Sequence, residues 1–164
     1  MIIRPATLDD APAILAIYTP YVLNTSISFE TQPPTLQQMC DRITMGLDHY
    51  GYFVVEDRGH VCGYAYGSAY RPRAAYGKSA EVSIYLSETA KGRGYGQALY
   101  GVLIDHLTGR GFHTVIGIVT TPNLASDRLH QACGFTLVGT LQDVGKKFGV
   151  WHGTSLYQRM IGIE

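Results

Sequence analysis

Apolar residues in the first part of the chain recur at helical spacing in two segments. The first segment follows the pair Thr7 and Asp10, whose spacing fits a helix capping box. Its apolar positions are Ala11, Ile14, Leu15, Ile17 and Tyr18. The second segment begins at a similar pair, Thr35 and Gln38, and extends to about Asp48. The polar stretch between the segments ends in a Pro-Pro pair, so two separate helices are predicted.

Alternation of apolar and polar positions predicts strands in the middle and at the end of the chain. Residues 79–86 alternate strictly, with Val82 and Ile84 on one face and Glu81 on the other. Two strand-like runs surround the short turn Asp57-Arg58-Gly59 and predict a hairpin. The full set of predicted strands is 1–4, 51–56, 60–69, 79–86, 113–119, 135–141 and 154–161.

Two further helices are predicted in the second half of the chain. One follows a glycine-dense turn at residues 91–96 and ends before Gly111, and a shorter one lies between the capping residue Asn123 and Cys133. The resulting order of strands and helices predicts an α/β protein of the α+β type, with a mixed sheet and helices packed on its faces. A chain of 164 residues has room for one core, so residues 1–164 are predicted to form a single domain.

Composition and charge narrow the classes of function. The 13 basic and 13 acidic residues balance, so a nucleic-acid-binding surface is not favoured. Cys40, Cys62 and Cys133 lack metal-type spacing, which favours free thiols in a reducing compartment and no metal site. The N-terminus has no signal-peptide pattern and no apolar run reaches membrane-spanning length. A soluble, cytoplasmic protein without a membrane partner is therefore predicted.

The glycine-dense turn is a candidate anion site. A strand that leads into such a turn and then into a helix leaves backbone N–H groups free at the helix N-terminus, where the helix dipole also favours negative charge. The turn has neither the G-x-G-x-x-G spacing of a dinucleotide fold nor the G-x-x-x-x-G-K-[ST] pattern of a P-loop. Taken alone, this pattern leaves open whether the turn binds a phosphate or is closed by glycines for backbone geometry only.

The combination of these segments resembles the GNAT superfamily of N-acetyltransferases. Lys91-x-x-Gly94-x-Gly96 is similar to the Q/R-x-x-G-x-G/A element that binds pyrophosphate in that superfamily, with Lys91 as a departure at the first position. The segments SISFETQPP, YRPRAAYGKSAEVSIYL, NLASDRLHQACGF and GKKFGVWHG are most similar to the branch of phosphinothricin and methionine sulfone or sulfoximine acetyltransferases. The resemblance implies the GNAT fold, a mostly antiparallel sheet of about seven strands with about four helices. It also implies acetyl transfer from acetyl-CoA to the amino group of a small amino-acid-like substrate.

The resemblance further implies how acetyl-CoA is held. Backbone groups of Ile84, Tyr85 and Leu86 are expected to bind the pantetheine arm and to meet the thioester carbonyl. Asn123 is expected to hydrogen-bond the pantetheine from the opposite side, although its context alone indicates a helix cap. The pyrophosphate is expected to be held by Gln97 together with the backbone amides of Gly92, Arg93, Gly94, Tyr95 and Gly96.

Acetylation requires a neutral amine, so an amine that is mostly protonated near pH 7 needs a proton acceptor. Glu81 matches the family's glutamate at this place, and its alternative is a solvated strand carboxylate. His130 occupies a position where many GNAT enzymes carry a tyrosine, proposed to protonate the departing thiolate, and a structural histidine is the alternative. Direct transfer in a ternary complex is favoured over an acyl-enzyme on Cys133, which has no evident base beyond His130.

The loop that follows the third predicted central strand is the candidate acceptor site. Two arginines at i and i+2 are suited to gripping a carboxylate and a second anionic or oxo group, although solvated loop arginines are the commoner alternative. Gln32 occupies a position where the relatives often carry an acidic residue. The residues that the resemblance assigns to the acceptor site are Phe29, Arg71, Pro72, Arg73, Tyr76 and Glu81.

Near the C-terminus, Lys147, Phe148 and Trp151 match a K-x-G-x-W pattern of the family, and Gly153 replaces the usual aspartate. Trp151 is expected to pack at a strand end. The apolar, aromatic character of this region, including Trp151 and Tyr157, and the resemblance together predict a homodimer.

Two other functions remain as alternatives. One is a binding module that senses acetyl-CoA or a metabolite without turnover, and the presence of both Glu81 and the complete glycine turn argues against it. The other is an acetyltransferase for a different amine, such as a protein N-terminus or an aminoglycoside. Such sites tend to be open or acidic, whereas the loop with Arg71 and Arg73 favours an anionic substrate.

Overall fold

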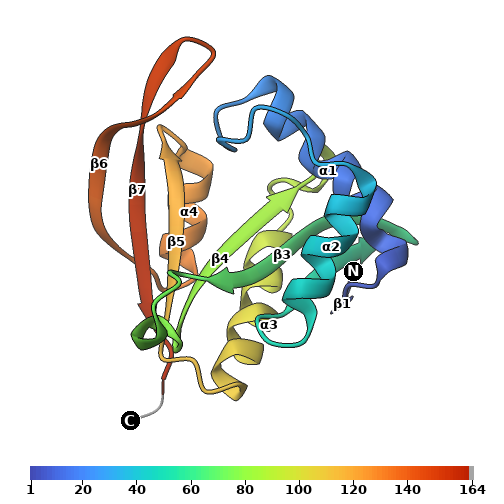
Figure 1. The fold of residues 1–164 in the computed structure, drawn as a ribbon. Helices are drawn as coiled ribbons and strands as arrows, with labels where there is room; N and C mark the ends of the chain where they lie inside the picture. Colours follow the sequence, from blue (N-terminus) through green and yellow to red (C-terminus); the bar gives the residue numbers. More distant parts are fainter. Residues whose placement is uncertain (163–164) are drawn as a thin grey trace.

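The computed structural model describes residues 1–162, so the last two residues of the predicted domain lie outside the described part. Seven strands form one sheet in the order β1-β2-β3-β4-β5-β7-β6, and only the β4–β5 pair is parallel. The predicted mixed, mostly antiparallel sheet is thereby confirmed (Figure 1). The strands are β1 (Ile2–Pro5), β2 (Tyr52–Asp57), β3 (His60–Ala69), β4 (Ser79–Leu86), β5 (Thr114–Thr121), β6 (Thr136–Lys147) and β7 (Val150–Met160).

Four α-helices accompany the sheet, as predicted: α1 (Ala11–Asn24), α2 (Leu36–Leu47), α3 (Tyr95–Gly109) and α4 (Leu124–Ala132). The capping box at Thr35 forms as the sequence indicates, because the Thr35 side chain accepts from the Gln38 N–H (3.1 Å) and Gln38 Oε1 accepts from the Thr35 N–H (2.8 Å). At the first helix, the pair Thr7 and Asp10 instead caps a short 3₁₀ turn, after which α1 begins.

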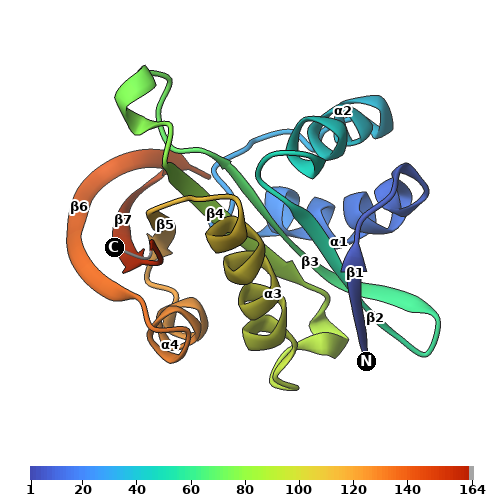
Figure 2. The same cartoon turned by 90° about the horizontal axis from the view of Figure 1, so that it is seen from below.

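Helices cover both faces of the sheet, as Figure 2 shows, with α3 and α4 on one side and α1 and α2 on the other. On the α3 side, Val82 of β4 packs into a core with Leu99 and Leu103. On the α1 and α2 side, Ile14 and Met39 pack against the sheet together with buried tyrosines. The tyrosines Tyr18, Tyr21, Tyr52, Tyr64, Tyr66 and Tyr85 form ring contacts on this face.

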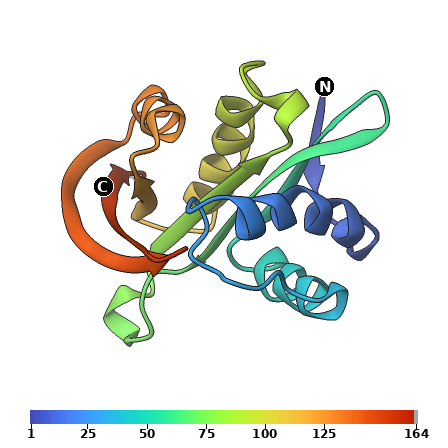
Figure 3. The same ribbon diagram turned by 90° about the horizontal axis from the view of Figure 1, so that it is seen from above.

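The two central strands separate soon after they meet. β4 and β5 pair over only three rungs, from Ser79 and Thr114 to Glu81 and Ile116. Beyond Glu81, β4 leans away from β5, which Figures 1 and 3 show from two directions. After Glu81, the edge of β4 that faces β5 therefore has no pairing with β5. The other edge of β4 pairs with β3 as far as Leu86. This separation opens the centre of the molecule.

The C-terminal hairpin is longer than the sequence indicated. Strands were predicted at 135–141 and 154–161, but β6 and β7 extend to a two-residue turn at Phe148 and Gly149, whose φ angles are 52° and 75°. The prediction of a packed Trp151 is also wrong, because its side chain is 55% exposed and only Lys146 Nζ lies over its ring, 5.7 Å from the centroid. Most of β6 is exposed on both faces. Its sequence therefore lacks the alternation of apolar and polar residues by which a half-buried strand is recognised. β6 curves around β7 (Figure 2).

Gly153 of β7 lies where a side chain does not fit. A Cβ atom there would overlap the backbone carbonyl oxygen of Leu141 and would lie 2.9 Å from Thr121 Oγ1. We expect Gly153→Ala to lower the free energy of unfolding by about 1–3 kcal/mol, the usual cost of an inserted methyl group in a filled site. Denaturant unfolding with Gly139→Ala as the control measures this, because a Cβ at Gly139 meets nothing within 4 Å. Equal stabilities of the two variants would contradict this expectation.

Candidate functional site

A pocket of about 510 Å³ lies in the opening between β4, the start of α3 and α4. Nine of the ten residues that the resemblance assigned to acetyl-CoA line it. These are Ile84, Tyr85, Leu86, Gly92, Gly94, Tyr95, Gly96, Gln97 and Asn123. They come from three separate parts of the chain, and the splayed strands and the two helices bring them together.

The glycine turn has the geometry that an anion site needs. Gly92 and Gly94 adopt φ angles of 72° and 80°, which glycine tolerates and other residues rarely adopt. Gly94 is the N-cap of α3, and the first residues of this 15-residue helix, whose N–H groups have no partner within the helix, line the pocket. A Cβ at either glycine would meet no atom within 4 Å, so a ligand can approach the backbone closely. The turn therefore fits a phosphate group.

The Arg93 side chain points away from the pocket, which leaves only its backbone N–H for the expected role. Its guanidinium pairs with Asp57 Oδ2 at 3.0 Å and lies over the Tyr95 ring, 4.7 Å from the centroid. The side chain is thus directed toward the β2–β3 turn, and Arg93 is the one predicted cofactor residue that does not line the pocket. The ion pair instead ties the glycine turn to the neighbouring hairpin.

Several pocket residues were not anticipated from the sequence. Tyr21 and Ile27 come from α1 and the loop after it, and the Tyr21 hydroxyl donates to the Leu86 carbonyl at 2.5 Å. Lys91 and Arg128 bring positive charge to the pocket wall, and Lys91 also pairs with Glu88. Lys91 is the first residue of the glycine element that the sequence did indicate. No local pattern marks Tyr21, Ile27 or Arg128, because only the tertiary fold places them at the pocket.

Asn123 caps α4, as its local context indicated, and it also lies at the pocket. Its side-chain oxygen accepts a hydrogen bond from the Ser126 N–H at 3.2 Å, which caps α4. The same residue lines the large pocket and a small cavity of about 50 Å³ next to it. Capping and contact with a ligand are therefore compatible at this position.

Glu81 lies at the last rung where β4 and β5 still pair, opposite Ile116 on one side and Ser68 on the other. Its side chain is on the sheet face that carries Ser83 and Tyr85, away from the core residue Val82, as the alternation predicted. Glu81 is half-buried, and this burial raises the pKa of its carboxyl group. A carboxylate with a raised pKa is suited to accepting a proton.

His130 is buried, with 3% of its surface exposed, and both ring nitrogens have partners. Nδ1 lies 2.8 Å from the Ser126 carbonyl oxygen, which can only accept, so Nδ1 carries the proton. Nε2, 3.2 Å from the Tyr100 hydroxyl, then accepts from it. Burial lowers the pKa of His130, and a Cβ at Gly117 would overlap the ring. The neutral, fixed imidazole is a poor source of a proton near pH 7.

The predicted acceptor loop is on the surface. Arg71, Pro72, Arg73 and Tyr76 are all exposed, and none of them lines the large pocket. Arg71 lies over the Tyr70 ring at 5.2 Å. The loop nevertheless begins beside Glu81, because Ser68 and Ala69 at the end of β3 pair with Glu81 and Ala80.

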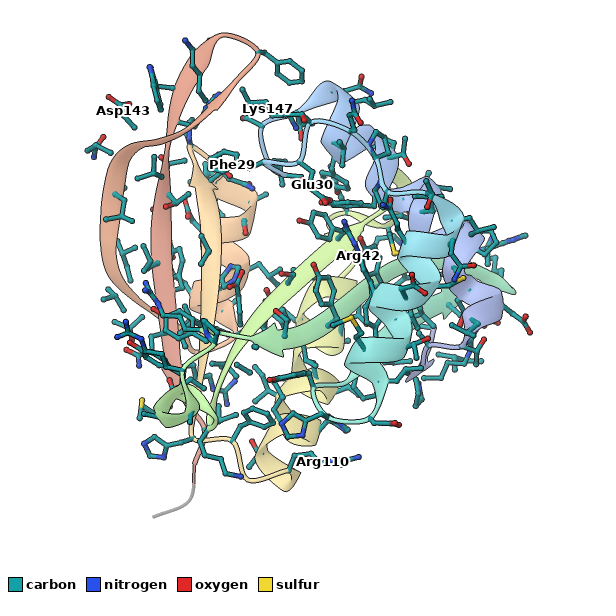
Figure 4. All side chains as sticks on the ribbon, in the orientation of Figure 1. Phe29, Glu30, Arg42, Arg110, Asp143 and Lys147 are labelled. Carbon is teal, nitrogen blue, oxygen red and sulfur yellow. The ribbon has the colours of Figure 1, made fainter. Side chains whose placement is uncertain are left out.

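Phe29 and its neighbours form a second wall, around the space between α2 and the C-terminal hairpin, as Figure 4 shows. Phe29 is 38% exposed, and its ring packs against the backbone of Gly145, leaving no space for a Cβ there. Gln32 brings no carboxylate to this side, but Glu30 does, and it pairs with Arg42. Lys147 of β6 points toward the same loop.

Residues 1–162 show neither a membrane-spanning helix nor a metal-binding cluster. None of the helices in this range is long and apolar enough to span a membrane. Within the same range, no three His, Cys, Asp or Glu side chains gather in a way that would hold a metal ion.

Comparison with known proteins identifies the family. The acetyltransferase (GNAT) domain family matches residues 3–155. The phosphinothricin N-acetyltransferase of Alcaligenes faecalis is 42% identical over 96% of this chain and 81% of its own length. The L-methionine sulfoximine/L-methionine sulfone acetyltransferase of Pseudomonas aeruginosa is 35% identical over 91% of this chain and 88% of its own length.

A solved structure agrees with this assignment. The phosphinothricin acetyltransferase of Sinorhizobium meliloti, determined in complex with AcCoA, has a TM-score of 0.94 and 39% identity over 98% of this chain and 88% of that chain. The protein belongs to the GNAT acetyltransferase family, and the predicted GNAT fold is confirmed.

The histidine environment predicts acid sensitivity of the fold. Because burial lowers the pKa of His130 below its unfolded value of about 6.5, the unfolded state binds more protons than the folded state below that pH. This contribution to stability is complete above about pH 6.5 and is lost as the pH falls toward the folded pKa, by at most about 1.4 kcal/mol per pH unit for one proton. Urea unfolding from pH 8 to pH 5 should show this decline.

His130→Gln should flatten the decline, although part of it should persist because burial also lowers the pKa of His106. His60→Gln, at the exposed β2–β3 turn, is the matched control and should keep the full slope. An identical slope in the His130 variant and the wild type would refute the assignment of the decline to this residue.

Proposed function

We propose that this protein transfers the acetyl group of acetyl-CoA to the amino group of a small, amino-acid-like molecule. The observation that carries the proposal is one pocket that joins the α3 N-terminus to the unpaired edge of β4, the strand that carries Glu81 at its last rung with β5. The names of the similar proteins, which act on phosphinothricin and on methionine sulfoximine or sulfone, support the choice of acceptor.

In this proposal the pocket holds acetyl-CoA by backbone groups. The N–H groups from Gly92 to Gly96, with Gln97, bind the pyrophosphate at the positive end of the α3 dipole. The unpaired edge of β4 offers backbone partners at Ile84 and Tyr85 to the pantetheine arm. Asn123 contacts that arm from the α4 side. Lys91 and Arg128 add positive charge for the phosphates.

The chemistry proposed is direct attack of the neutral amine on the thioester carbonyl. Glu81 accepts the proton of the incoming ammonium. Burial raises the pKa of its carboxyl group toward the pKa of that ammonium, which favours the transfer. The amine nitrogen forms the new C–N bond and the C–S bond of the thioester breaks. The nitrogen then loses its second proton through solvent to the departing thiolate, which leaves as the CoA thiol. His130, neutral and held by Ser126 and Tyr100, is assigned to shaping the cavity wall, because it carries no spare proton for the thiolate.

The acceptor's own charges require partners near Glu81. Arg71 and Arg73 start from the end of β3 beside it and provide two guanidinium groups for a carboxylate and an oxo group. Pro72 and Tyr76 complete this loop, and Phe29 provides an apolar wall on the other side. The exposure of the loop leaves both arginines free to reach a ligand.

A homodimer and a cytoplasmic location are part of the proposal. The C-terminal hairpin exposes many apolar side chains on one element: Leu137, Val138, Leu141, Val144, Phe148, Val150 and Trp151. Such a concentration of exposed apolar residues favours a partner surface. Tyr157, which the sequence suggested for this surface, is buried (3% exposed) and bonds Asp127, so it belongs to the core instead. Three free cysteines suit a reducing compartment.

The proposed reaction is tested by thiol release from acetyl-CoA with a panel of amines. Phosphinothricin, methionine sulfone and methionine sulfoximine should support turnover well above the common amino acids, an aminoglycoside and a peptide with a free N-terminus. Mass spectrometry should show one acetyl group on the amine. Preference for the peptide or the aminoglycoside would overturn the acceptor class, and tight acetyl-CoA binding without any turnover would favour the sensing module.

Glu81→Gln should lower kcat by roughly 100-fold or more, the usual contribution of a general base, with little change in acetyl-CoA affinity. The wild-type rate should fall as the pH drops through the raised pKa of Glu81, because the protonated carboxyl accepts no proton. Higher pH should reduce the defect of the variant, since more amine is already neutral. Glu88→Gln, an exposed glutamate near the glycine turn, is the control. A variant with normal kcat from pH 6 to 9 would remove Glu81 as the base.

Light scattering at micromolar concentration should give twice the monomer mass of 18.0 kDa. Val138→Glu in the exposed hairpin should shift the mass toward the monomer, because burying an unpaired carboxylate in an apolar interface carries a large desolvation cost. Glu88→Gln again serves as the control. A monomer mass for the wild type would refute the dimer.

A further inference from the structure

Lys147 is a buried lysine that the proposed reaction does not use. It ends β6 with only 4% of its surface exposed, and its Nζ donates to the Ser28 carbonyl at 2.6 Å. Across residues 1–162, the ion pairs found include none to Lys147. Burial lowers the pKa of this amine, and the charge of Glu30 acts in the opposite direction. The lysine therefore holds a backbone carbonyl without a directly paired carboxylate.

Stability alone does not explain a lysine at this place. Taking an ammonium group out of water costs several kcal/mol, and an apolar side chain of similar volume is often as stabilising or more so. Methionine has a similar length and would carry no such cost. What a lysine adds is a directional, charged donor, and here that donor reaches across 119 residues of sequence to one carbonyl oxygen.

The carbonyl belongs to a segment that organises a polar network. Ser28 Oγ lies 2.7 Å from the Tyr18 hydroxyl, and this hydroxyl also donates to Glu30. Glu30 in turn accepts two hydrogen bonds from Arg42, at 2.5 and 3.0 Å. Lys147 thus connects the C-terminal hairpin to α1, to α2 and to the loop between them, and Figure 4 shows Lys147, Glu30 and Arg42 around one space.

The same segment forms two walls of the site. Ile27 lines the large pocket and the small cavity beside His130, and its carbonyl accepts from Thr120 Oγ1 at 3.3 Å. Phe29 packs on Gly145 of the hairpin. Residues 27–30 therefore face the acetyl-CoA pocket at one end and the proposed acceptor space at the other.

We infer that Lys147 is a positioning residue for the acceptor: by holding the Ser28 carbonyl, it fixes residues 27–30 so that Phe29 and the Glu30–Arg42 pair meet the acceptor in one arrangement. The inference rests on the proposed function for its kinetic consequence. Its structural consequence, a fixed segment 27–30, does not depend on the reaction. Lys146, the next residue, is exposed and provides a matched lysine without this contact.

Three variants of the full chain test the kinetic consequence. Lys147→Met removes the donor, and KM for the best acceptor of the panel should rise about tenfold or more, the loss expected for a hydrogen bond from a charged group. kcat and the acetyl-CoA Kd from calorimetry should change less than KM, because most of the pocket lies on β4, α3 and α4. Lys147→Arg should restore much of the acceptor KM, and Lys146→Met should behave like the wild type.

Amide hydrogen exchange of the free protein tests the structural consequence. The amides of residues 26–31 should exchange about tenfold faster in Lys147→Met than in the wild type, whereas Lys146→Met should leave them unchanged. Unchanged exchange together with an unchanged acceptor KM in Lys147→Met would overturn the inference. Equal KM losses in the Met and Arg variants with unchanged exchange would also overturn it.

The inference stays testable if Lys147→Met does not fold or if the wild type shows no turnover. If Lys147→Met does not fold, Tyr18→Phe takes its place, because it removes the hydroxyl shared by Ser28 and Glu30 while its ring still packs on Tyr85. Its amides at 26–31 should then exchange faster, and normal exchange would refute the network. If the wild type acetylates no amine of the panel, the proposed function fails, and the exchange result alone decides whether Lys147 fixes the segment.

Discussion

The structure depends on the point where β4 and β5 stop pairing. Three rungs of parallel pairing end at Glu81 and Ile116, and the strands then diverge. An unpaired strand edge inside a protein is costly unless a ligand or another chain satisfies its backbone groups. The divergence therefore creates at once an edge that can bind an extended arm and a space between two helices in which that arm can lie. Glu81 lies at the apex of this divergence, the place that the proposed function assigns to the proton acceptor.

The other walls are arranged around this opening. The α3 N-terminus directs its free N–H groups at one end of the pocket, and the ion pair between Arg93 and Asp57 fixes the preceding turn from outside. His130 fills the wall on the α4 side, where Gly117 leaves room for its ring. Positive charge at this pocket is local, from Lys91 and Arg128 in its wall, in a protein whose net charge is zero.

The proposed acceptor side is built differently, from side chains of distant elements. Arg42 of α2 pairs with Glu30 of the loop after α1, and Lys147 of β6 reaches the same loop at the Ser28 carbonyl. Two cations and one carboxylate leave a net positive charge on this side, which suits an anionic acceptor. The exposed loop with Arg71 and Arg73 adds two further positive charges, and it begins beside Glu81 at the end of β3.

The sequence by itself determined the elements that depend on local rules. Apolar periodicity located four helices and seven strands, the Thr35 and Gln38 pair marked the start of α2, and the turn 91–96 indicated the anion site, because each of these is encoded by neighbours within a few residues. The length of the C-terminal hairpin, the outward direction of Arg93, the burial of His130 and the meeting of Lys147 with Ser28 were decided by the tertiary structure. These features depend on contacts between segments up to 119 residues apart, and no local pattern carries that information.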